Sequence, residues 1–362
     1  MRWATWGLAL VLAACSGTPP VSTSLPQVGP SSEGPPAGHE IVAGGDRTAL
    51  FALPTSAEVD SARNLVPSLP TPAAVSVTST APAADGARQF IIALDDDRQR
   101  VATAVARVPG PAAATTALPT IVVLTDGTDG ASADDLLTGD GYARLVDQTV
   151  QVVVAYRGEP LAVAGETIGS DLPADPYVSD VADALAFVDG LATIPRVDTT
   201  RVAFVGLGRG GTVALLAGGA SGVGAIVTLG APTDLLATSF RDAVRSLLRG
   251  TSPQDPYPAL AALAAPALGV RDGTTPLADA RLGLLARSPA RTAQGLPPVF
   301  ALHADGDRVV GEDQLGALQA LLSGSALQGI TLLVEDTTHD DLGQLPSVRD
   351  DVSQFILRTL AP

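Results

Sequence analysis

Unbroken apolar runs alternate with amphipathic stretches along the chain from about residue 86 onward. The runs with the character of buried strands are 120–125 (TIVVLT), 149–156 (TVQVVVAY), 201–206 (RVAFVG) and 223–229 (VGAIVTL). Between the second and the third run, residues 177–192 place apolar side chains at three- and four-residue spacing, which predicts an amphipathic helix. Strands that lack polar alternation and are separated by helices form parallel sheets covered on both faces. The pattern therefore predicts an α/β fold with a mostly parallel sheet flanked by helices on both faces.

The same periodicity continues on both sides of this central block. Residues 89–94 and 99–108 are strand-like and flank Asp95-Asp96-Asp97, which predicts a hairpin with a solvated turn rather than a metal loop. Further along, 298–303 and 329–335 are strand-like, and 312–322 and 348–360 have helical spacing. Residues 231–297 are interrupted by prolines and show no strand periodicity, so we expect a helical insertion there.

The N-terminal residues have the pattern of a secretory signal. Arg2 precedes an apolar run at 3–12, which is too short to span a bilayer as a stable helix. Leu12-Ala13-Ala14-Cys15 resembles the bacterial lipobox, and the resemblance implies cleavage after a signal peptide of residues 1–14. Cys15 would then carry lipid and anchor the chain to a lipid bilayer, facing the periplasm or the extracellular side of the cell envelope. The alternative is an ordinary cleaved signal in which Cys15 is incidental.

Three further segments follow the predicted signal. Residues 15–40 consist mostly of Ser, Thr, Pro and Gly, a composition that cannot offset the entropy of ordering and predicts a flexible tether. Residues 41–85 contain short apolar pieces broken by prolines, so we expect a partly ordered linker. Whether this linker adds an edge strand stays open. Residues 86–362 form the predicted domain.

Composition excludes several classes of partner and site. The 362 residues contain 22 basic side chains, all of them Arg, and 38 acidic ones, which gives a formal charge of −16. That charge opposes binding to nucleic acid, which is a polyanion. A single Cys excludes an intramolecular disulfide and a Cys-cluster zinc site, and three His make a His-rich metal centre improbable. We therefore expect no metal and no cofactor.

Candidate chemistry follows three predicted strands, at the sheet edge where sites of open α/β sheets gather. The segments are Gly206-Leu207-Gly208-Arg209-Gly210-Gly211, His303-Ala304-Asp305-Gly306-Asp307 and Glu335-Asp336-Thr337-Thr338-His339. The order of elbow, Asp and His resembles α/β-hydrolases, in which a G-x-S-x-G turn presents a serine. Over 86–362 the chain resembles the prolyl oligopeptidase and dienelactone hydrolase type, also through Tyr156-Arg157-Gly158, Asp180 and Arg287-Ser288-Pro289-Ala290.

The resemblance assigns the acid to Asp307 and the base to His339, but it places Gly208 at the position of the serine nucleophile. Asp305 is the second choice for the acid, and His303 is expected to support the strand end. The main-chain N–H groups of Arg209 and Asp126 are the candidate oxyanion donors. The carboxylate of Asp126 would oppose an oxyanion unless it points to solvent.

Without a hydroxyl on the elbow, the covalent step of acyl transfer has no nucleophile. The leading hypothesis is therefore a membrane-anchored α/β-hydrolase-like lipoprotein, impaired or inactive as a serine hydrolase, that acts as a binding module. The alternative is an active esterase or serine-type peptidase on ester or peptide substrates, in which Asp307 and His339 activate water or a mobile Ser or Thr enters the site. A third hypothesis is a purely structural envelope lipoprotein.

Overall fold

The structure, a computed structural model, describes residues 41–42, 45–65, 74–80, 86–96, 99–110, 115–126, 128–138, 141–248, 257, 259–323 and 329–362. The predicted signal peptide 1–14, with Cys15, and the predicted tether 15–40 lie outside the described residues. Among the helices of the described ranges, none combines the length and the apolar character needed to cross a bilayer.

The apolar runs form the centre of a nine-stranded sheet in the order β14-β13-β12-β11-β6-β8-β5-β4-β3. From β14 to β8 neighbouring strands are parallel, whereas β8, β5, β4 and β3 pair antiparallel. The predicted mostly parallel sheet and the hairpin of β4 and β5 are thus confirmed. The strands are β3 (Ala74–Ser79), β4 (Arg88–Asp96), β5 (Gln99–Val108), β6 (Leu118–Leu124), β8 (Val150–Ala155), β11 (Val197–Leu207), β12 (Ala225–Leu229), β13 (Val299–Ala304) and β14 (Gly329–Val334).

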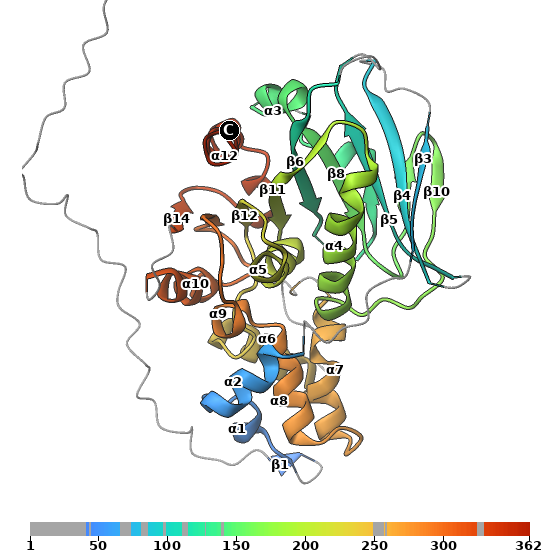
Figure 1. The fold of residues 1–362 in the computed structure, drawn as a ribbon. Helices are drawn as coiled ribbons and strands as arrows, with labels where there is room; N and C mark the ends of the chain where they lie inside the picture. Colours follow the sequence, from blue (N-terminus) through green and yellow to red (C-terminus); the bar gives the residue numbers. More distant parts are fainter. Residues whose placement is uncertain are drawn as a thin grey trace, which may run out of the picture. The chain divides into compact units, whose positions relative to one another are not determined.

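Helices cover both faces of the sheet and bury two separate apolar cores (Figure 1). One face packs against α4 (Val178–Gly190), α5 (Arg209–Ser221) and α10 (Asp313–Ser323), the other against α3 (Ala143–Gln148) and α12 (Pro346–Thr359). Alternate side chains of β6 serve the two cores: Val122 and Leu124 belong to the first, Ile121 and Val123 to the second. Because both faces are buried, the central strands have no polar alternation, as the sequence shows.

Residues 231–297 form the expected helical insertion. Its helices are α6 (Thr238–Leu248), α7 (Leu260–Arg271), α8 (Leu277–Ala286) and α9 (Pro289–Thr292). They enclose a third apolar core in which the rings of Phe240 and Tyr257 meet edge to face, with centroids 5.3 Å apart. Aromatic pairs of this geometry stabilise beyond the area that they bury.

Within 41–85, whose structure the sequence leaves open, the described residues 47–63 contact this insertion and residues 74–79 extend the sheet. This segment supplies β1 (Ile41–Val42), β2 (Gly45–Asp46), α1 (Arg47–Leu50), α2 (Ser56–Arg63) and the edge strand β3. Thr55 and Glu58 form a capping box at the start of α2. Figure 1 shows α1 and α2 beside α8, where the Arg281 guanidinium bonds to Glu58 (2.6 Å) and to the carbonyls of Ala49, Leu50 and Ala52.

Two smaller features lie near the candidate site and have no strong sequence signal. A three-stranded sheet contains β7 (Ala131–Ser132), β9 (Leu161–Val163) and β10 (Glu166–Ile168). A four-residue helix, α11 (His339–Leu342), follows β14. Strands of two or three residues are too short for periodicity to reveal them.

Replacing Arg281 with Ala should loosen the N-terminal segment from α8. The change leaves Glu58 and three carbonyls without their donor, so we expect the free energy of unfolding to fall by about 2–4 kcal/mol. We also expect faster protease cleavage within 47–63. Urea unfolding and limited proteolysis check both expectations. Arg271→Ala is the matched control, because Arg271 on α7 pairs only with the neighbouring Asp272 at the surface. Equal unfolding midpoints for Arg281→Ala and wild type would contradict the role assigned to Arg281.

Candidate functional site

A tight glycine turn joins β11 to α5. Gly208 lies between the two elements with φ +46° and ψ −115°, a backbone conformation that side chains rarely allow. A Cβ on Gly206 would lie 2.3 Å from the Gly210 carbonyl oxygen, and one on Gly210 would lie 2.0 Å from the Leu124 oxygen. The flanking glycines therefore let helix α5 approach the sheet closely, which places buried residue 208 at the bend of an elbow.

The carboxylate of Asp126 occupies the space above Gly208. A Cβ on Gly208 would lie 2.2 Å from both Cγ and Oδ1 of Asp126. Oδ1 accepts a hydrogen bond of 3.0 Å from the main-chain N–H of Arg209, the first residue of α5. Asp126 thus comes from the end of β6 and fills the volume where a nucleophilic side chain on the elbow would begin.

His339, the first residue of α11, lies between two carboxylates. Its Nδ1 is 2.7 Å from Oδ2 of Asp307, and its Nε2 is 3.0 Å from Oδ2 of Asp126. The other oxygen of Asp307 accepts the N–H groups of Val309 and Val310 at 2.9 and 2.7 Å, which fixes this carboxylate in the turn after β13. The structure therefore brings Asp307, His339, Asp126 and the Arg209 amide into one hydrogen-bonded row beside Gly208.

The surroundings of His339 favour its charged form. Burial alone lowers its pKa, but the hydrogen bonds to Asp126 and Asp307 and the charges of both carboxylates outweigh burial and raise the pKa to about 10. His339 is therefore an imidazolium at neutral pH and donates a proton from each ring nitrogen. In that state it has no lone pair with which to accept a proton from a nucleophile.

The neighbouring candidates have supporting roles. His303 is buried, and its Nε2 donates to the Val310 carbonyl at 2.8 Å; burial lowers the pKa of His303. Asp305 accepts the Thr337 N–H at 3.3 Å. Asp307, and not the second choice Asp305, is therefore the carboxylate that bonds to the imidazole of His339.

A buried cluster of charged side chains anchors Arg209, the residue directly after the elbow glycine. The fully buried guanidinium of Arg209 bonds to both oxygens of Asp180, each at 2.7 Å, and to Glu159 at 2.5 Å. It also lies 4.7 Å from the ring centroid of Tyr156. Paired, hydrogen-bonded charges are the condition under which an Arg can be buried. Sequence reasoning considered only the backbone of Arg209 and missed Glu159 altogether.

The Tyr156-Arg157-Gly158 segment is held by helix α4, which also carries Asp180. Asp183 of α4 accepts the Arg157 guanidinium in a bidentate pair at 2.5 and 3.1 Å. Gly158 has φ +78°, and a Cβ there would lie 2.3 Å from the Ala174 nitrogen. These contacts hold the segment after β8 against α4 and residue 174.

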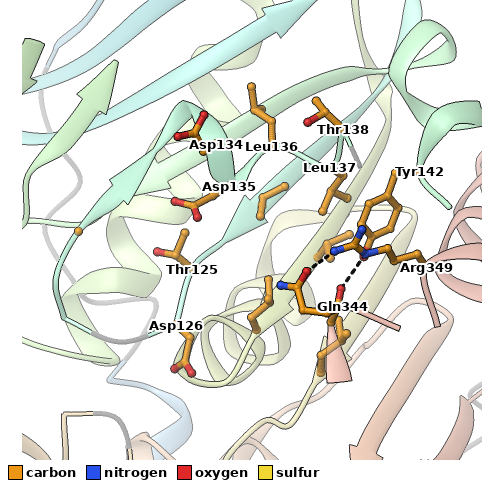
Figure 2. A pocket seen from close by; sticks show the side chains of 16 residues that line it. Thr125, Asp126, Asp134, Asp135, Leu136, Leu137, Thr138, Tyr142, Gln344 and Arg349 are labelled. Atoms are coloured by element: carbon orange, nitrogen blue, oxygen red, sulfur yellow. Dashed lines mark hydrogen bonds between the residues drawn. The ribbon is translucent and has the colours of Figure 1, made fainter. Parts of the chain in front are cut away.

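A cavity of about 460 Å³ opens beside Asp126 (Figure 2). Its apolar lining comes from the strand ends and the loop that follows β7: Val123, Val205, Leu207, Leu229, Leu136 and Leu137. Figure 2 shows Asp134 and Asp135 on the same side as Asp126, with Arg349 and Gln344 across the cavity. Its volume and mixed lining are those of a small-molecule site.

Known structures resemble this chain over most of its length. The acetyl xylan esterase of a Paenibacillus species matches 86% of this chain with 98% of its own, at TM-score 0.59 and 15% identity. Acetyl xylan esterase 1 of a Thermoanaerobacterium species matches 84% with 93% of its own, at 0.56 and 14%. Dipeptidyl peptidase 4 of Porphyromonas gingivalis matches 79%, at 0.52 and 13%, and the match spans 42% of that larger chain.

No protein-family model and no curated protein sequence matches the chain. At the identities of the structural matches, the likeness shows the fold alone. Together with the sheet order and the helices on both faces, it shows that this chain has the α/β-hydrolase fold. Its structural neighbours include both esterases and a peptidase.

The imidazolium of His339 should make stability fall as pH rises. Its pKa is about 10 in the folded chain against 6.5 in the unfolded one, so its contribution is complete below pH 6.5 and is lost towards pH 10. Between pH 6.5 and 9 we expect the free energy of unfolding to fall by about 3 kcal/mol, at about 1.4 kcal/mol per pH unit.

Urea unfolding across this range checks the expectation, and His339→Asn should remove most of the slope. In this range the slope comes mainly from His339, because the chain contains no Lys and burial raises the pKa of its four tyrosines above the usual value. His303, whose pKa burial lowers, contributes near the lower end of the range with the opposite sign. A flat wild-type profile would mean that His339 is neutral.

Proposed function

We propose that this chain is an α/β-hydrolase-like lipoprotein, impaired or inactive as a serine hydrolase, that binds a small ester- or peptide-like molecule. The observation that carries the proposal is the Asp126 carboxylate above Gly208, 2.2 Å from the point where a side chain at the elbow would begin. In the orientation that the structure shows, this carboxylate leaves no room for a side chain at the elbow.

Two requirements of acyl transfer are unmet in this geometry. The covalent step needs a hydroxyl or thiol at the elbow, and Gly208 has no side chain. The proton must pass to a neutral imidazole, whereas His339 is charged and donates to two carboxylates. In addition, the carboxylate of Asp126 already accepts the Arg209 N–H that would stabilise an oxyanion.

Three hydroxyls outside the elbow turn are engaged with other partners. Thr212 on α5 donates to the Pro232 carbonyl, and Ser179 on α4 donates to Asp175. Ser170 donates to the Val101 carbonyl at 2.6 Å. These bonds support the inference that none of the three takes over as nucleophile. The alternative of an active hydrolase also requires that His339 lose its proton near neutral pH.

A serine-reactive fluorophosphonate should fail to label the purified protein, and small aryl esters should show no turnover above background. Gly208→Ser alone should be less active than a variant that also lacks the carboxylate, because Asp126 must turn away before the serine fits. Gly208→Ser with Asp126→Ala removes that clash and one of the two charges that raise the pKa of His339. We expect the double variant to hydrolyse an aryl ester at least about 100-fold faster than wild type.

Two results would contradict the proposal. One is labelling of the wild type at any serine by the fluorophosphonate. The other is wild-type ester turnover that disappears in His339→Ala, because a contaminating esterase would survive that substitution. Gly208→Ala with Asp126→Ala is the matched control for the double variant, since it lacks only the hydroxyl.

We further propose that the chain is anchored in the cell envelope through lipid on Cys15. The support is the Leu12-Ala13-Ala14-Cys15 sequence and the Ser- and Pro-rich stretch after it. Two or more acyl chains bury enough hydrocarbon for durable anchoring, at about 0.8 kcal/mol per CH₂.

Cys15→Ser should move the protein from the membrane fraction to the soluble fraction of a bacterial host. Metabolic labelling with a fatty acid should mark the wild type and not the variant. Ser16→Ala is the matched control and should keep both properties. Membrane association that survives Cys15→Ser would contradict lipid anchoring at this residue.

A further inference from the structure

We propose that the place filled by the Asp126 carboxylate is a binding site for an organic monocarboxylate, which displaces Asp126 and takes over its hydrogen bonds. This inference rests on the proposed function and names the ligand class of the same site. On this view Asp126 is an intramolecular ligand that occupies the site until a competing carboxylate arrives.

Two donors converge on the carboxylate from different elements. The Arg209 N–H at the start of the 13-residue helix α5 donates to one oxygen, and Nε2 of His339 donates to the other, each at 3.0 Å. A helix N-terminus and an imidazolium both favour an anion. Charge-assisted hydrogen bonds of this kind are the stronger ones in proteins. Any carboxylate in this position would receive the same two bonds.

The two carboxylates that flank His339 differ in how far they are exposed to water and in how their oxygens are held. The side chain of Asp307 is fully buried, and its second oxygen is held by two main-chain N–H groups. The side chain of Asp126 is 29% exposed, and Asp126 lies two residues beyond the end of β6. Rotation of Asp126 towards water thus exposes the two donors, whereas Asp307 keeps His339 in place.

The cavity beside Asp126 supplies room for the rest of the ligand. Its floor is aliphatic, formed by Val205, Leu207 and Leu229 at the ends of β11 and β12. An alkyl or aryl group there would remove apolar surface from water. Asp134 and Asp135 line the same cavity as Arg349, and because two fixed carboxylates face one cation there, a second negative charge on the ligand is disfavoured. The ligand that fits best therefore carries one carboxylate and an apolar body.

The test measures the melting temperature of the full-length protein with sodium butyrate or sodium benzoate, against sodium chloride at equal ionic strength. Butyramide is the neutral control, and succinate tests for repulsion of a dianion. We expect saturable stabilisation by the monocarboxylates, because a ligand of the folded state raises the melting temperature by mass action. Asp126→Ala should bind butyrate at least tenfold more tightly than wild type, since its site is vacant.

Two further substitutions, Asp126→Asn and His339→Gln, test whether the ligand binds at this place. Asp126→Asn should lie between wild type and Asp126→Ala, and it replaces the latter if that variant does not fold. Adding His339→Gln to either variant should weaken butyrate binding at least tenfold.

If the carboxylates raise the melting temperature of the Asp126 variants no more than sodium chloride does, there is no carboxylate site at this place and the proposal is wrong. If butyrate and benzoate stabilise only the Asp126 variants, Asp126 never leaves its place in the native protein. That result would overturn the proposed displacement of Asp126 by the ligand. Unchanged binding in the His339→Gln background would place the ligand elsewhere and also overturn the proposal. Fluorophosphonate labelling is scored separately, so a failure of the proposed function is distinguishable from a failure of this inference.

Discussion

The hydrogen-bonded carboxylate of Asp126 governs the chemistry of the whole site. It fills the space above Gly208 and accepts the hydrogen bond of the Arg209 amide. Together with Asp307, it also keeps a proton on His339. Each effect acts against acyl transfer by a different route: steric exclusion, loss of an oxyanion donor and loss of a base. Under the proposed function, their common origin in one side chain explains how an acid and a histidine can stay paired in a chain that is impaired as a serine hydrolase.

The scaffold around this contact is rigid where the site needs it. Close approach of α5 to the sheet depends on Gly206 and Gly210, and the buried pairing of Arg209 with Asp180 and Glu159 ties the elbow to α4 and to the loop after β8. Buried charges of this kind stabilise only when all their partners remain. Asp126 lies on the opposite, cavity side of the elbow, where its side chain reaches water.

The sequence predicted most of the fold, because the central strands are buried on both faces and their apolar runs are unbroken. It also placed the elbow, Asp307 and His339 through the order of three strand ends. It could not predict β9 or β10, whose few residues carry no periodicity, or the docking of α2, which depends on Arg281 more than 200 residues away. The orientation of Asp126 was equally out of reach. Sequence reasoning left open whether the Asp126 carboxylate faces the oxyanion position or points to solvent, and the structure places it over the elbow, where it accepts the Arg209 N–H.

The contact between Gly208 and Asp126 constrains the order of events in any lineage that reached this chain from a serine hydrolase. A serine at residue 208 and the present orientation of the Asp126 side chain cannot coexist, so in such a lineage the carboxylate took its place over the elbow only after the nucleophile had gone. From the present chain, a serine at 208 meets that carboxylate unless Asp126 turns away, and loss of the carboxylate deprives the Arg209 and His339 donors of this acceptor. The two positions are therefore coupled, and a return to the ancestral arrangement involves both of them.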